Sequence, residues 1–377
     1  MKKILFAAST LSHIENFHIP YLKEFKDKGY IIHVMGKPNN KTNIPYNDKI
    51  ISIPFEKSIF SFNNFLNALK IAKIIKTENY DIIILHTTLA AFFARLGIMM
   101  SFNKPKVVIN TVHGYLFDNK TSFLKRSVML LAEKFTKCVT HTIIVMNSED
   151  YKIAEKYKLY KNNLYFINGM GVDLSLFPTT TYENKILLRE KNNFSKNDFI
   201  LVYAAEFSNR KNQKFLLHSL KSIISDGYKH IKLLLLGDGA LLDELKMYSK
   251  ELEISENVIF TGYKKNTCIY YQLSDVCVSS SRIEGLPFNI IEAMSVGLPI
   301  VASNIKGHND LVISNENGFL YEYNNTDEFC TCIKNLYENK ELYSKMSIKS
   351  KSFSQKYSID NVLLNTVNII NQSKSHI

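Results

Sequence analysis

The chain has 377 residues, of which 46% are hydrophobic and 22% are charged. This composition is typical of soluble globular proteins and excludes collagen-like and largely disordered chains, and the length fits two domains of about 150 residues each. The formal net charge of +12 is uneven, because residues 1–175 carry 24 basic and 13 acidic side chains and residues 176–377 carry 23 and 22. We therefore expect the first half to meet an anionic surface or substrate.

Short apolar runs alternate with helical patterns along the first half. The opening run ends at Ser9 and is shorter than the apolar region of a signal peptide, so it predicts a buried strand. The most apolar window, 82–100, contains His86 and Arg95 and predicts a strand and a helix instead of a membrane span. The predicted strands are 3–7, 31–35, 82–85, 107–111, 142–146 and 164–167. The predicted helices are 19–28, 62–76, a helix from 89, and 122–137.

The second half repeats the alternation after a break. Around residues 169–195 the pattern lapses at Pro178 and three consecutive threonines, which indicates a linker. The predicted strands beyond it are 200–204, 231–236, 258–261, 276–279, 300–302 and 318–321. The predicted helices are 211–225, 240–252, 289–295, 327–337 and 358–371. Near-continuous apolar strands that alternate with helices are typical of parallel α/β sheets covered on both faces. We expect domains at 1–175 and 176–352, and a final helical stretch at 353–377.

A dense group of polar residues lies at 279–294, between a predicted strand and helix. Gly285 and Pro287 suit a tight turn into a first helical turn, whose N–H groups and dipole can hold a diphosphate. Glu284 and Glu292, eight residues apart, can accept hydrogen bonds from sugar hydroxyls. A solvated position is the commoner alternative for a glutamate, but the helix is apolar nearly all round, which favours a site.

The segment EGLPFNIIEAMSVGLPIVAS, which begins at Glu284, resembles the E-x7-E signature of the family 4 glycosyltransferases. Residues 233–263 resemble the segment that lines the nucleotide pocket of this family, and residues 168–177 resemble its interdomain linker. Residues 9–34 and the segment TVHGYLF at 111–117 resemble members that build bacterial capsular polysaccharides or exopolysaccharides. The resemblance implies a GT-B fold, in which two Rossmann-like parallel-sheet domains face a cleft and the C-terminal helix crosses back to the first domain.

The resemblance also implies a role for each motif residue of the second domain. Glu284 would contact hydroxyls of the transferred sugar, and Glu292 the ribose hydroxyls of the nucleotide. The N–H groups of the turn would hold phosphate, and backbone atoms after two predicted strands would bind the base. The turn comprises Gly285, Leu286, Pro287, Phe288 and Asn289. The base positions are Gly237, Tyr263 and Lys264.

The family carries a basic pair on the donor diphosphate in a G-R-L-x-x-x-K-G pattern. The matching stretch here, 205–212, has the lysine as Lys211 but has Glu206 at the arginine position. Positive charge is needed because the diphosphate gains charge as the glycosidic bond breaks. We assign Lys211 to catalysis. Arg210 is a candidate for the missing charge, although its side chain could equally point to solvent.

Histidines follow two predicted strands of the first domain. The resemblance implies that His113 faces the donor sugar or its phosphate, whereas a satisfied core histidine would be the commoner alternative without it. His13 and His18 follow the first strand, where the family places acceptor- and phosphate-facing residues. We expect His13, with Ser12, on the acceptor side, because His13 is nearer the turn.

Several motifs are absent from the sequence. There is no D-x-D triplet, G-x-x-x-x-G-K-[ST] or H-E-x-x-H, and the five cysteines include no C-x-x-C pair. We therefore expect neither a disulfide framework nor a zinc pair, and no cofactor or metal. In the expected reaction Lys211 and helix N–H groups replace the cation, and a UDP-sugar is the co-substrate.

The charge excess of the first half includes one distinctive segment. Its basic residues surround apolar ones, as in an amphipathic helix that rests on anionic lipid. The residues are Lys120, Lys125, Arg126, Lys134 and Lys137 around Phe117, Phe123, Leu124, Met129 and Leu130. An ordinary helix with its apolar face in the core is an equal alternative. Nucleic acid is the rival anion, but no RNA-binding or helix-turn-helix pattern supports it.

The resemblance implies a retaining glycosyltransferase. It would move a hexose or N-acetylhexosamine from a nucleotide sugar, UDP-linked in the first instance, to a polyprenyl-diphosphate-linked saccharide in capsular, exopolysaccharide or O-antigen synthesis. We expect a cytoplasmic enzyme, with a peripheral place on the inner membrane face left open. A GT-B UDP-sugar epimerase and a non-catalytic nucleotide-sugar binder are the alternatives. The basic segment and the E-x7-E signature argue against the first, and intact Glu284, Glu292 and Lys211 against the second.

Overall fold

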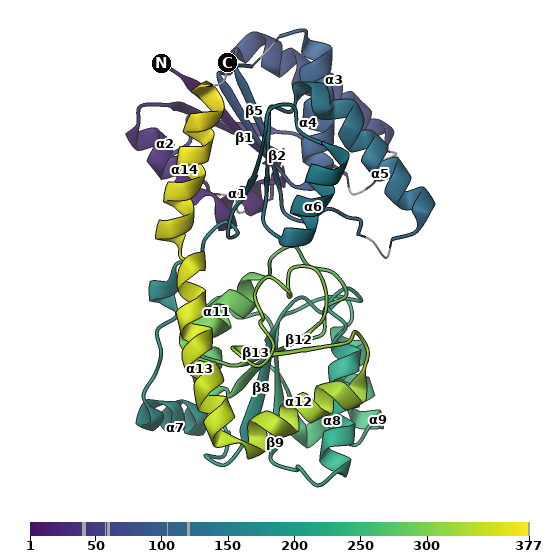
Figure 1. Cartoon of the computed structure of the whole chain (residues 1–377), viewed down its shortest axis with the longest axis vertical. Helices are drawn as coiled ribbons and strands as arrows, with labels where there is room; N and C mark the ends of the chain where they lie inside the picture. The colour runs from purple at the N-terminus through teal and green to yellow at the C-terminus, as the bar shows by residue number, and fades with distance from the viewer. Residues whose placement is uncertain (40–42, 57, 59–60, 104, 119–120, 376–377) are drawn as a thin grey trace. The chain divides into compact units, whose positions relative to one another are not determined.

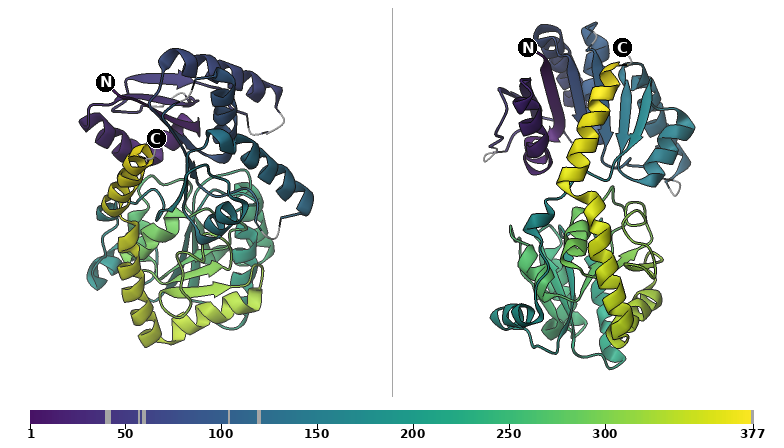
Figure 2. Two further views of the ribbon diagram at one scale, coloured as in Figure 1. Left: turned by 45° about the horizontal axis from the view of Figure 1, so that its top comes forward. Right: turned by 60° about the vertical axis from the view of Figure 1, so that its left-hand side comes forward.

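The computed structural model describes residues 1–39, 43–56, 58, 61–103, 105–118 and 121–375. The chain divides into two compact units. The first unit comprises Met1–Gly171 and Asp360–Ile377, and the second unit comprises Val172–Ile359. In each unit a sheet lies between helices (Figures 1 and 2).

The first unit contains a sheet of seven parallel strands in the order β3-β2-β1-β4-β5-β6-β7. The strands are β1 (Lys3–Thr10), β2 (Ile31–Lys37), β3 (Lys49–Ser52), β4 (Ile82–His86), β5 (Val107–Val112), β6 (Thr142–Val145) and β7 (Asn163–Phe166). The chain runs outward from β1 to β3 and then continues in the opposite direction from β4. The switch point therefore lies between β1 and β4, where open α/β sheets bind ligands at the carboxyl ends of their strands.

The helices of the first unit are α1 (Leu11–Phe17), α2 (Ile19–Asp27), α3 (Phe62–Glu78), α4 (Thr88–Ser101), α5 (Phe123–Thr136), α6 (Ser148–Tyr157) and α14 (Ile359–Ser375). Helices α3 and α4 pack closely at Gly97, where a Cβ would lie 2.8 Å from Cγ2 of Ile71 and 2.9 Å from the carbonyl oxygen of Ala68. Helix α14 joins this unit, and the hydroxyl of Thr142 on β6 donates to that of Ser373 at 2.9 Å. Residues more than 200 positions apart in the sequence therefore close one core.

The second unit contains a sheet of six parallel strands in the order β10-β9-β8-β11-β12-β13. The strands are β8 (Phe199–Ala204), β9 (Ile231–Leu236), β10 (Val258–Phe260), β11 (Val276–Ser279), β12 (Ile300–Ser303) and β13 (Gly318–Tyr321). The helices are α7 (Tyr182–Lys191), α8 (Gln213–Ser225), α9 (Leu242–Glu251), α10 (Cys268–Leu273), α11 (Phe288–Val296), α12 (Thr326–Glu338) and α13 (Lys340–Ser354). The switch point of this sheet lies between β8 and β11.

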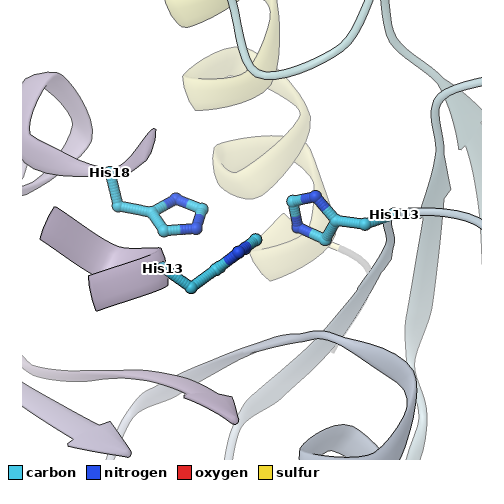
Figure 3. Close-up of side chains that lie close together, drawn as sticks. All are labelled: His13, His18 and His113. Carbon is cyan, nitrogen blue, oxygen red and sulfur yellow. The ribbon is translucent and has the colours of Figure 1, made fainter. Parts of the chain in front are cut away.

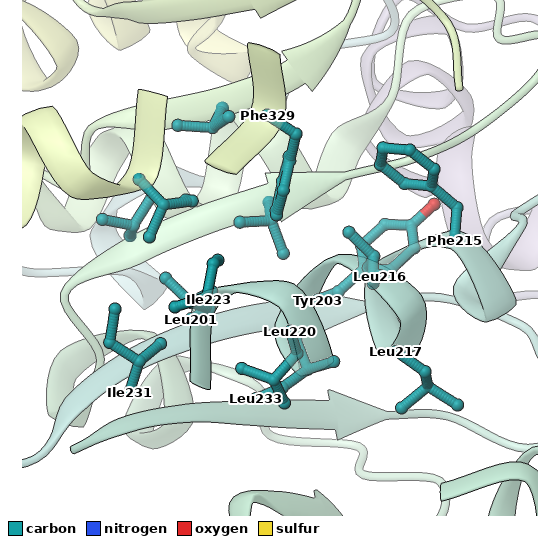
Figure 4. Close-up of a cluster of buried hydrophobic side chains, with 14 of the residues drawn as sticks. Leu201, Tyr203, Phe215, Leu216, Leu217, Leu220, Ile223, Ile231, Leu233 and Phe329 are labelled. Carbon is teal, nitrogen blue, oxygen red and sulfur yellow. The ribbon is translucent and has the colours of Figure 1, made fainter. Parts of the chain in front are cut away.

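The core of the second unit explains why these strands form. Leu201, Leu233 and Ile231 from the strands are at most 1% exposed, and they pack against Leu220 of α8 and Phe329 of α12 (Figure 4). Apolar residues on every position of a strand require cover on both faces, which helices provide. The predicted α/β class with parallel sheets is confirmed.

One difference from the sequence prediction is in residues 169–195. This stretch holds helix α7, whose first turn is capped by the hydroxyl of Thr181. The helix is fixed by charge, since Lys185 and Arg189 pair with Asp275 at 2.8 and 2.6 Å. Because charged side chains replace an apolar stripe, the hydrophobic pattern gave no signal for this helix. The predicted linker contains the boundary between the two units, at Gly171 and Val172, but Tyr182–Lys191 within it form α7.

Smaller elements complete the description. The 3₁₀ turns are η1 (Lys137–Val139), η2 (Leu174–Leu176), η3 (Ser255–Asn257) and η4 (Gln355–Tyr357). Among the described residues, no helix is both long enough and apolar enough to cross a membrane.

Candidate active site

One carboxylate and two cations meet at the switch point of the second unit. Glu284 lies in the turn between β11 and α11, and its side chain is only 8% exposed. Lys211 Nζ lies 2.5 Å from Glu284 Oε1, and Arg210 Nη1 lies 3.1 Å from both carboxylate oxygens. We call these three residues the carboxylate–cation cluster. The sequence left open whether Arg210 supplies the missing positive charge or points to solvent. Its side chain pairs with Glu284 but is 45% exposed, so each expectation is met in part.

Burial and neighbouring charges shift the pKa values of Glu284 and Lys211 in opposite directions. Burial alone would raise the pKa of Glu284, but the neighbouring Lys211 and Arg210 outweigh it and hold the pKa below its usual value. Burial lowers the pKa of Lys211, and Glu284 opposes that shift. The carboxylate is therefore ionised at neutral pH, with two cations held beside it.

Backbone and hydroxyl contacts hold the two turns of the cluster together. The Ser280 hydroxyl, just after β11, donates to the carbonyl oxygen of Lys211 at 2.9 Å. The N–H of Arg282 donates to the carbonyl oxygen of Arg210, also at 2.9 Å. Tyr203 of β8 shares a 2.7 Å hydrogen bond with the Ser281 hydroxyl. These supporting serines and the tyrosine were not predicted, and the only signal for them in the sequence is the run of three serines from Ser279, the last residue of β11.

Glu292, the second signature glutamate, lies on α11 in a different environment. It accepts hydrogen bonds from the hydroxyls of Tyr271, at 3.1 Å, and Thr267, at 3.4 Å. Burial raises the pKa of Glu292, and these two hydrogen bonds oppose the shift. The two glutamates therefore differ, since one is paired with cations and the other only with hydroxyls.

A cavity of about 440 Å³ opens at the carboxyl ends of β8 and β9. Five residues of the predicted donor site line it: Gly237, Tyr263, Lys264, Asn289 and Glu292. The other predicted residues of this unit are not among its walls, namely Glu284, Lys211, Arg210, Gly285, Leu286, Pro287 and Phe288. Glu206, Asp238, Lys265 and Phe177 also line the cavity and were not predicted there. In the sequence, Glu206 stands out only as a departure from the basic pattern.

Gly237 has a structural reason to be glycine. Its φ is +141°, and a Cβ there would lie 2.0 Å from the carbonyl oxygen of Ala205. The chain segments after β8 and β9 can approach this closely only without a side chain. Gly237 thus shapes the cavity wall through its backbone.

Histidines gather at the switch point of the first unit. His13 lies in α1, His18 joins α1 to α2, His86 ends β4, and His113 follows β5. Ring centroids lie 4.6 Å apart for His13 and His113 and 3.9 Å apart for His18 and His86. His86 Nδ1 and His113 Nε2 are hydrogen-bonded at 3.0 Å. We call these four residues the histidine cluster.

Two members of the histidine cluster, His13 and His113, are predicted site residues, and His18 is the alternative to His13 after the first strand. Ser12, predicted beside His13, donates instead to the hydroxyl of Thr10 at 3.0 Å. Burial lowers the pKa of His13 to about 4 and holds the pKa of the other three rings well below the usual range. The cluster is therefore uncharged at neutral pH.

A separate buried histidine of the second unit lies near Glu284 and Lys211 of the carboxylate–cation cluster. His308 is fully buried, with Nε2 3.1 Å from the Ser279 hydroxyl and Nδ1 2.8 Å from the carbonyl oxygen of Ser303. Burial lowers the pKa of His308 to about 4. Between the unfolded value of about 6.5 and this folded value, the unfolded chain binds the proton more readily. The stability that neutral His308 contributes is thus present above pH 6.5 and lost as the pH falls towards 4.

His308→Gln is expected to reduce the loss of stability on acidification. Across this window the slope of unfolding free energy against pH should become shallower by up to about 1.4 kcal/mol per pH unit, which corresponds to one proton. Hydrogen exchange of peptides from β11 and β12, in urea at several pH values, measures the slope for the second unit, and the exposed His218→Gln is the control, which should keep the wild-type slope. An unchanged slope in His308→Gln would contradict the assignment.

The two units match two descriptions of known families. Residues 3–147 match the family model described as glycosyl transferase 4-like, and residues 184–353 match that described as glycosyl transferases group 1. The glycosyltransferase EpsD of Bacillus subtilis is 32% identical over 357 residues, which cover 95% of this chain and 93% of EpsD. The chain belongs to the glycosyltransferases. The resemblance inferred from the E-x7-E segment and the predicted enzyme class are confirmed.

Two further comparisons place this glycosyltransferase among known proteins. The Escherichia coli UDP-Gal:alpha-D-GlcNAc-diphosphoundecaprenol alpha-1,3-galactosyltransferase is 28% identical over 290 residues, which cover 76% of this chain and 74% of the relative. The crystal structure of Anabaena HepE in complex with UDP matches with a TM-score of 0.80 at 18% identity, over 99% of this chain and 100% of HepE. That likeness concerns the fold alone, and the predicted GT-B fold is confirmed.

Proposed function

We propose that this glycosyltransferase moves a hexose or N-acetylhexosamine from a UDP-sugar to a lipid-diphosphate-linked saccharide, with retention of configuration. The observation that carries the proposal is the carboxylate–cation cluster at the switch point of the second sheet. A buried, ionised Glu284 with Lys211 and Arg210 beside it is suited to a ligand that has both hydroxyls and a diphosphate.

Each member of the cluster has a distinct part in this proposal. Glu284 accepts hydrogen bonds from hydroxyls of the transferred sugar, while Lys211 and Arg210 stabilise the charge that develops on the departing diphosphate. The turn from Gly285 to Asn289 adds N–H groups at the start of α11. These fixed groups take the part of a cation on the donor side, so we propose a donor site without metal.

The cavity beside β8 and β9 is assigned to the nucleoside. Its walls offer the Glu292 carboxylate to ribose hydroxyls, and Gly237, Tyr263 and Lys264 surround the space for the base. HepE, which shares the fold, was solved with UDP, and this supports a uridine nucleotide. The acceptor hydroxyl then attacks, and the departing UDP takes its proton.

The acceptor is assigned to the first unit. The relative from E. coli is named for a diphosphoundecaprenol acceptor, and the charge excess of the chain lies in residues 1–175. We place His13 and Ser12 on the acceptor side, and His113 towards the reacting sugar. An acceptor on a lipid also calls for contact with a bilayer.

Helix α5 supports a peripheral place on anionic membrane. Its exposed apolar residues are Phe123 at 77%, Leu124 at 76%, Val128 at 41%, Leu131 at 69% and Phe135 at 57%. The helix also carries Lys125, Arg126 and Lys134, and Lys137 follows it. An apolar face with neighbouring lysines is typical of helices that lie on anionic lipid.

The predicted composition of the α5 face is wrong in part. Phe117 is only 1% exposed, and Met129 and Leu130 pack against the core of the first unit. These three residues therefore hold the helix in place, and Leu131 and Phe135 join the exposed face instead. Lys120, which the sequence analysis also included, lies outside the described residues.

The proposed function is tested by supplying UDP-sugars one at a time, with vesicles that contain polyprenyl-diphosphate-linked saccharides. We expect one donor to release UDP only when the lipid is present. When the sugar of that donor is labelled, the label should appear in the lipid product, with the anomeric configuration retained. Conversion of a UDP-sugar to its epimer without lipid would overturn the proposal in favour of an isomerase. Binding without turnover across the donor panel would overturn it in favour of a binder.

The vesicle assay also tests whether the exposed apolar face of α5 binds the membrane. Leu131→Ser with Phe135→Ser is expected to lower transfer and binding on anionic vesicles at least tenfold, because two apolar side chains no longer enter the bilayer. Transfer to detergent-solubilised acceptor should be unchanged. Ile348→Ser, which removes a residue that is 69% exposed on α13 of the second unit, is the matched control. Equal vesicle binding by both variants would rule out the α5 face.

A further inference from the structure

The histidine cluster contains buried polar atoms whose partners are missing from the protein itself. His18 is fully buried, and neither of its ring nitrogens has a hydrogen-bond partner among the residues that the structure describes. The same holds for Nε2 of His13 and Nε2 of His86. Buried polar atoms without partners are rare in native proteins, and each calls for an explanation, such as an ion.

Three of these rings converge. One nitrogen from each of His13, His18 and His113 lies within 4.8 Å of the other two. The rings point toward one another from α1, from the junction of α1 and α2, and from the loop after β5 (Figure 3). Zinc binds imidazole nitrogen at about 2.0–2.1 Å in tetrahedral sites, so two such nitrogens lie about 3.4 Å apart. Small rotations of the three side chains would therefore bring their nitrogens to that spacing.

The fourth histidine of the cluster orients one of the three. His86 Nδ1 is hydrogen-bonded to His113 Nε2 at 3.0 Å, which fixes the direction of the His113 ring. His86 is thus a positioning residue.

We propose that His13, His18 and His113 bind a divalent transition-metal ion, zinc in the first place, with one coordination position left open. Three imidazole nitrogens suit zinc, copper, nickel and cobalt better than magnesium or calcium, which prefer oxygen ligands. Three protein ligands with an open fourth position distinguish zinc sites that act on a substrate from structural sites with four ligands. This proposal differs from the sequence expectation that no residue binds metal.

The open position is assigned to an oxygen of the acceptor's diphosphate, and this step rests on the proposed function. His18 is buried, whereas His13 and His113 are partly exposed, so the accessible side of the ion is formed by the latter two. The site lies at the carboxyl edge of the sheet, between β1 and β4, where ligands of open α/β sheets bind. An ion there would neutralise and orient a diphosphate.

The metal is tested with cobalt, whose visible spectrum reports tetrahedral coordination. The full chain is purified without a polyhistidine tag, treated with chelator, and titrated with Co²⁺. We expect one Co²⁺ per chain with intense visible bands, and displacement by Zn²⁺. His13→Ala, at a partly exposed position, should lower the affinity at least tenfold, as should His18→Asn. The control is His218→Ala with His230→Ala, at exposed positions of the second unit, and it should bind as the wild type does.

Two results would overturn the metal site. One is the absence of stoichiometric Co²⁺ binding to wild-type chain, and the other is unchanged affinity in His13→Ala with its thermal melting temperature intact. The melting temperature separates a lost ligand from a lost fold.

The open position is tested in the same cuvette with inorganic diphosphate. We expect diphosphate to change the spectrum of the Co²⁺-loaded chain and to leave that of His13→Ala unaffected. An unchanged wild-type spectrum would overturn the acceptor assignment. Because these readouts need no turnover, a failed transfer assay alongside normal Co²⁺ binding would overturn the proposed function and leave the metal site standing.

Discussion

Replacing Lys211 with methionine is expected to lower kcat for sugar transfer by about 100- to 1,000-fold, the usual effect of removing one preplaced group that stabilises transition-state charge. Lys211 is 9% exposed and is held 2.5 Å from Glu284, so its charge is already placed when the diphosphate begins to leave. Methionine keeps the length and apolar character of the stem but removes the ammonium. Since the developing charge exists only in the transition state, kcat should fall more than KM rises.

Two variants give this result its controls. Lys214→Met removes a lysine whose side chain is 58% exposed and which pairs with Glu244 at 3.6 Å, and it should leave kcat unchanged. Arg210→Gln should have an intermediate effect, because Arg210 is more exposed than Lys211. Initial rates of UDP release, measured at saturating acceptor over a range of donor concentrations, provide kcat and KM. A Lys211→Met enzyme with full activity would remove Lys211 from the reaction.

Strands were predictable where burial is complete. Every residue of β4 is buried, so its apolar run is visible without any knowledge of its neighbours. Strand β3 was missed because it lies at the sheet edge, where only one of its four residues is buried. Helix α7 was missed for a related reason, since ion pairs to Asp275 hold it and periodicity detects only apolar stripes.

The candidate site was predictable only where its residues are close in sequence. Glu284 and Glu292 share one turn and helix, and Lys211 follows a single strand. The partners of Glu292 come from the segment around α10, more than 20 residues earlier, and nothing local marks Tyr271 as one of them. The histidine cluster depends on the order β1-β4-β5 in the sheet, which places His86 between histidines that lie about 70 and 27 positions away in the sequence. Strand order is a tertiary property, so His86 carried no signal by itself.

Breaking the pair between Arg95 and Glu133 is expected to destabilise the first unit by about 3–5 kcal/mol. Arg95 of α4 is fully buried, and its two terminal nitrogens donate to the two oxygens of Glu133 on α5 at 2.8 and 2.9 Å. In Arg95→Met the Glu133 carboxylate stays buried without its cation, and in Glu133→Leu the guanidinium stays buried without its anion. Each single change therefore leaves an uncompensated charge in a low-dielectric interior.

The double variant Arg95→Met with Glu133→Leu should recover most of this loss, because neither charge remains to be desolvated. Lys26→Met is the control within the same unit, since its pair with Asp48 is 39% and 35% exposed and should contribute at most about 1 kcal/mol. The chain has two units, so one unfolding midpoint does not report on either alone. Hydrogen exchange of peptides from α4 and α5 measures the first unit directly. If the double variant exchanges as fast as the single ones, packing of the two stems, and not charge compensation, holds α5 against α4.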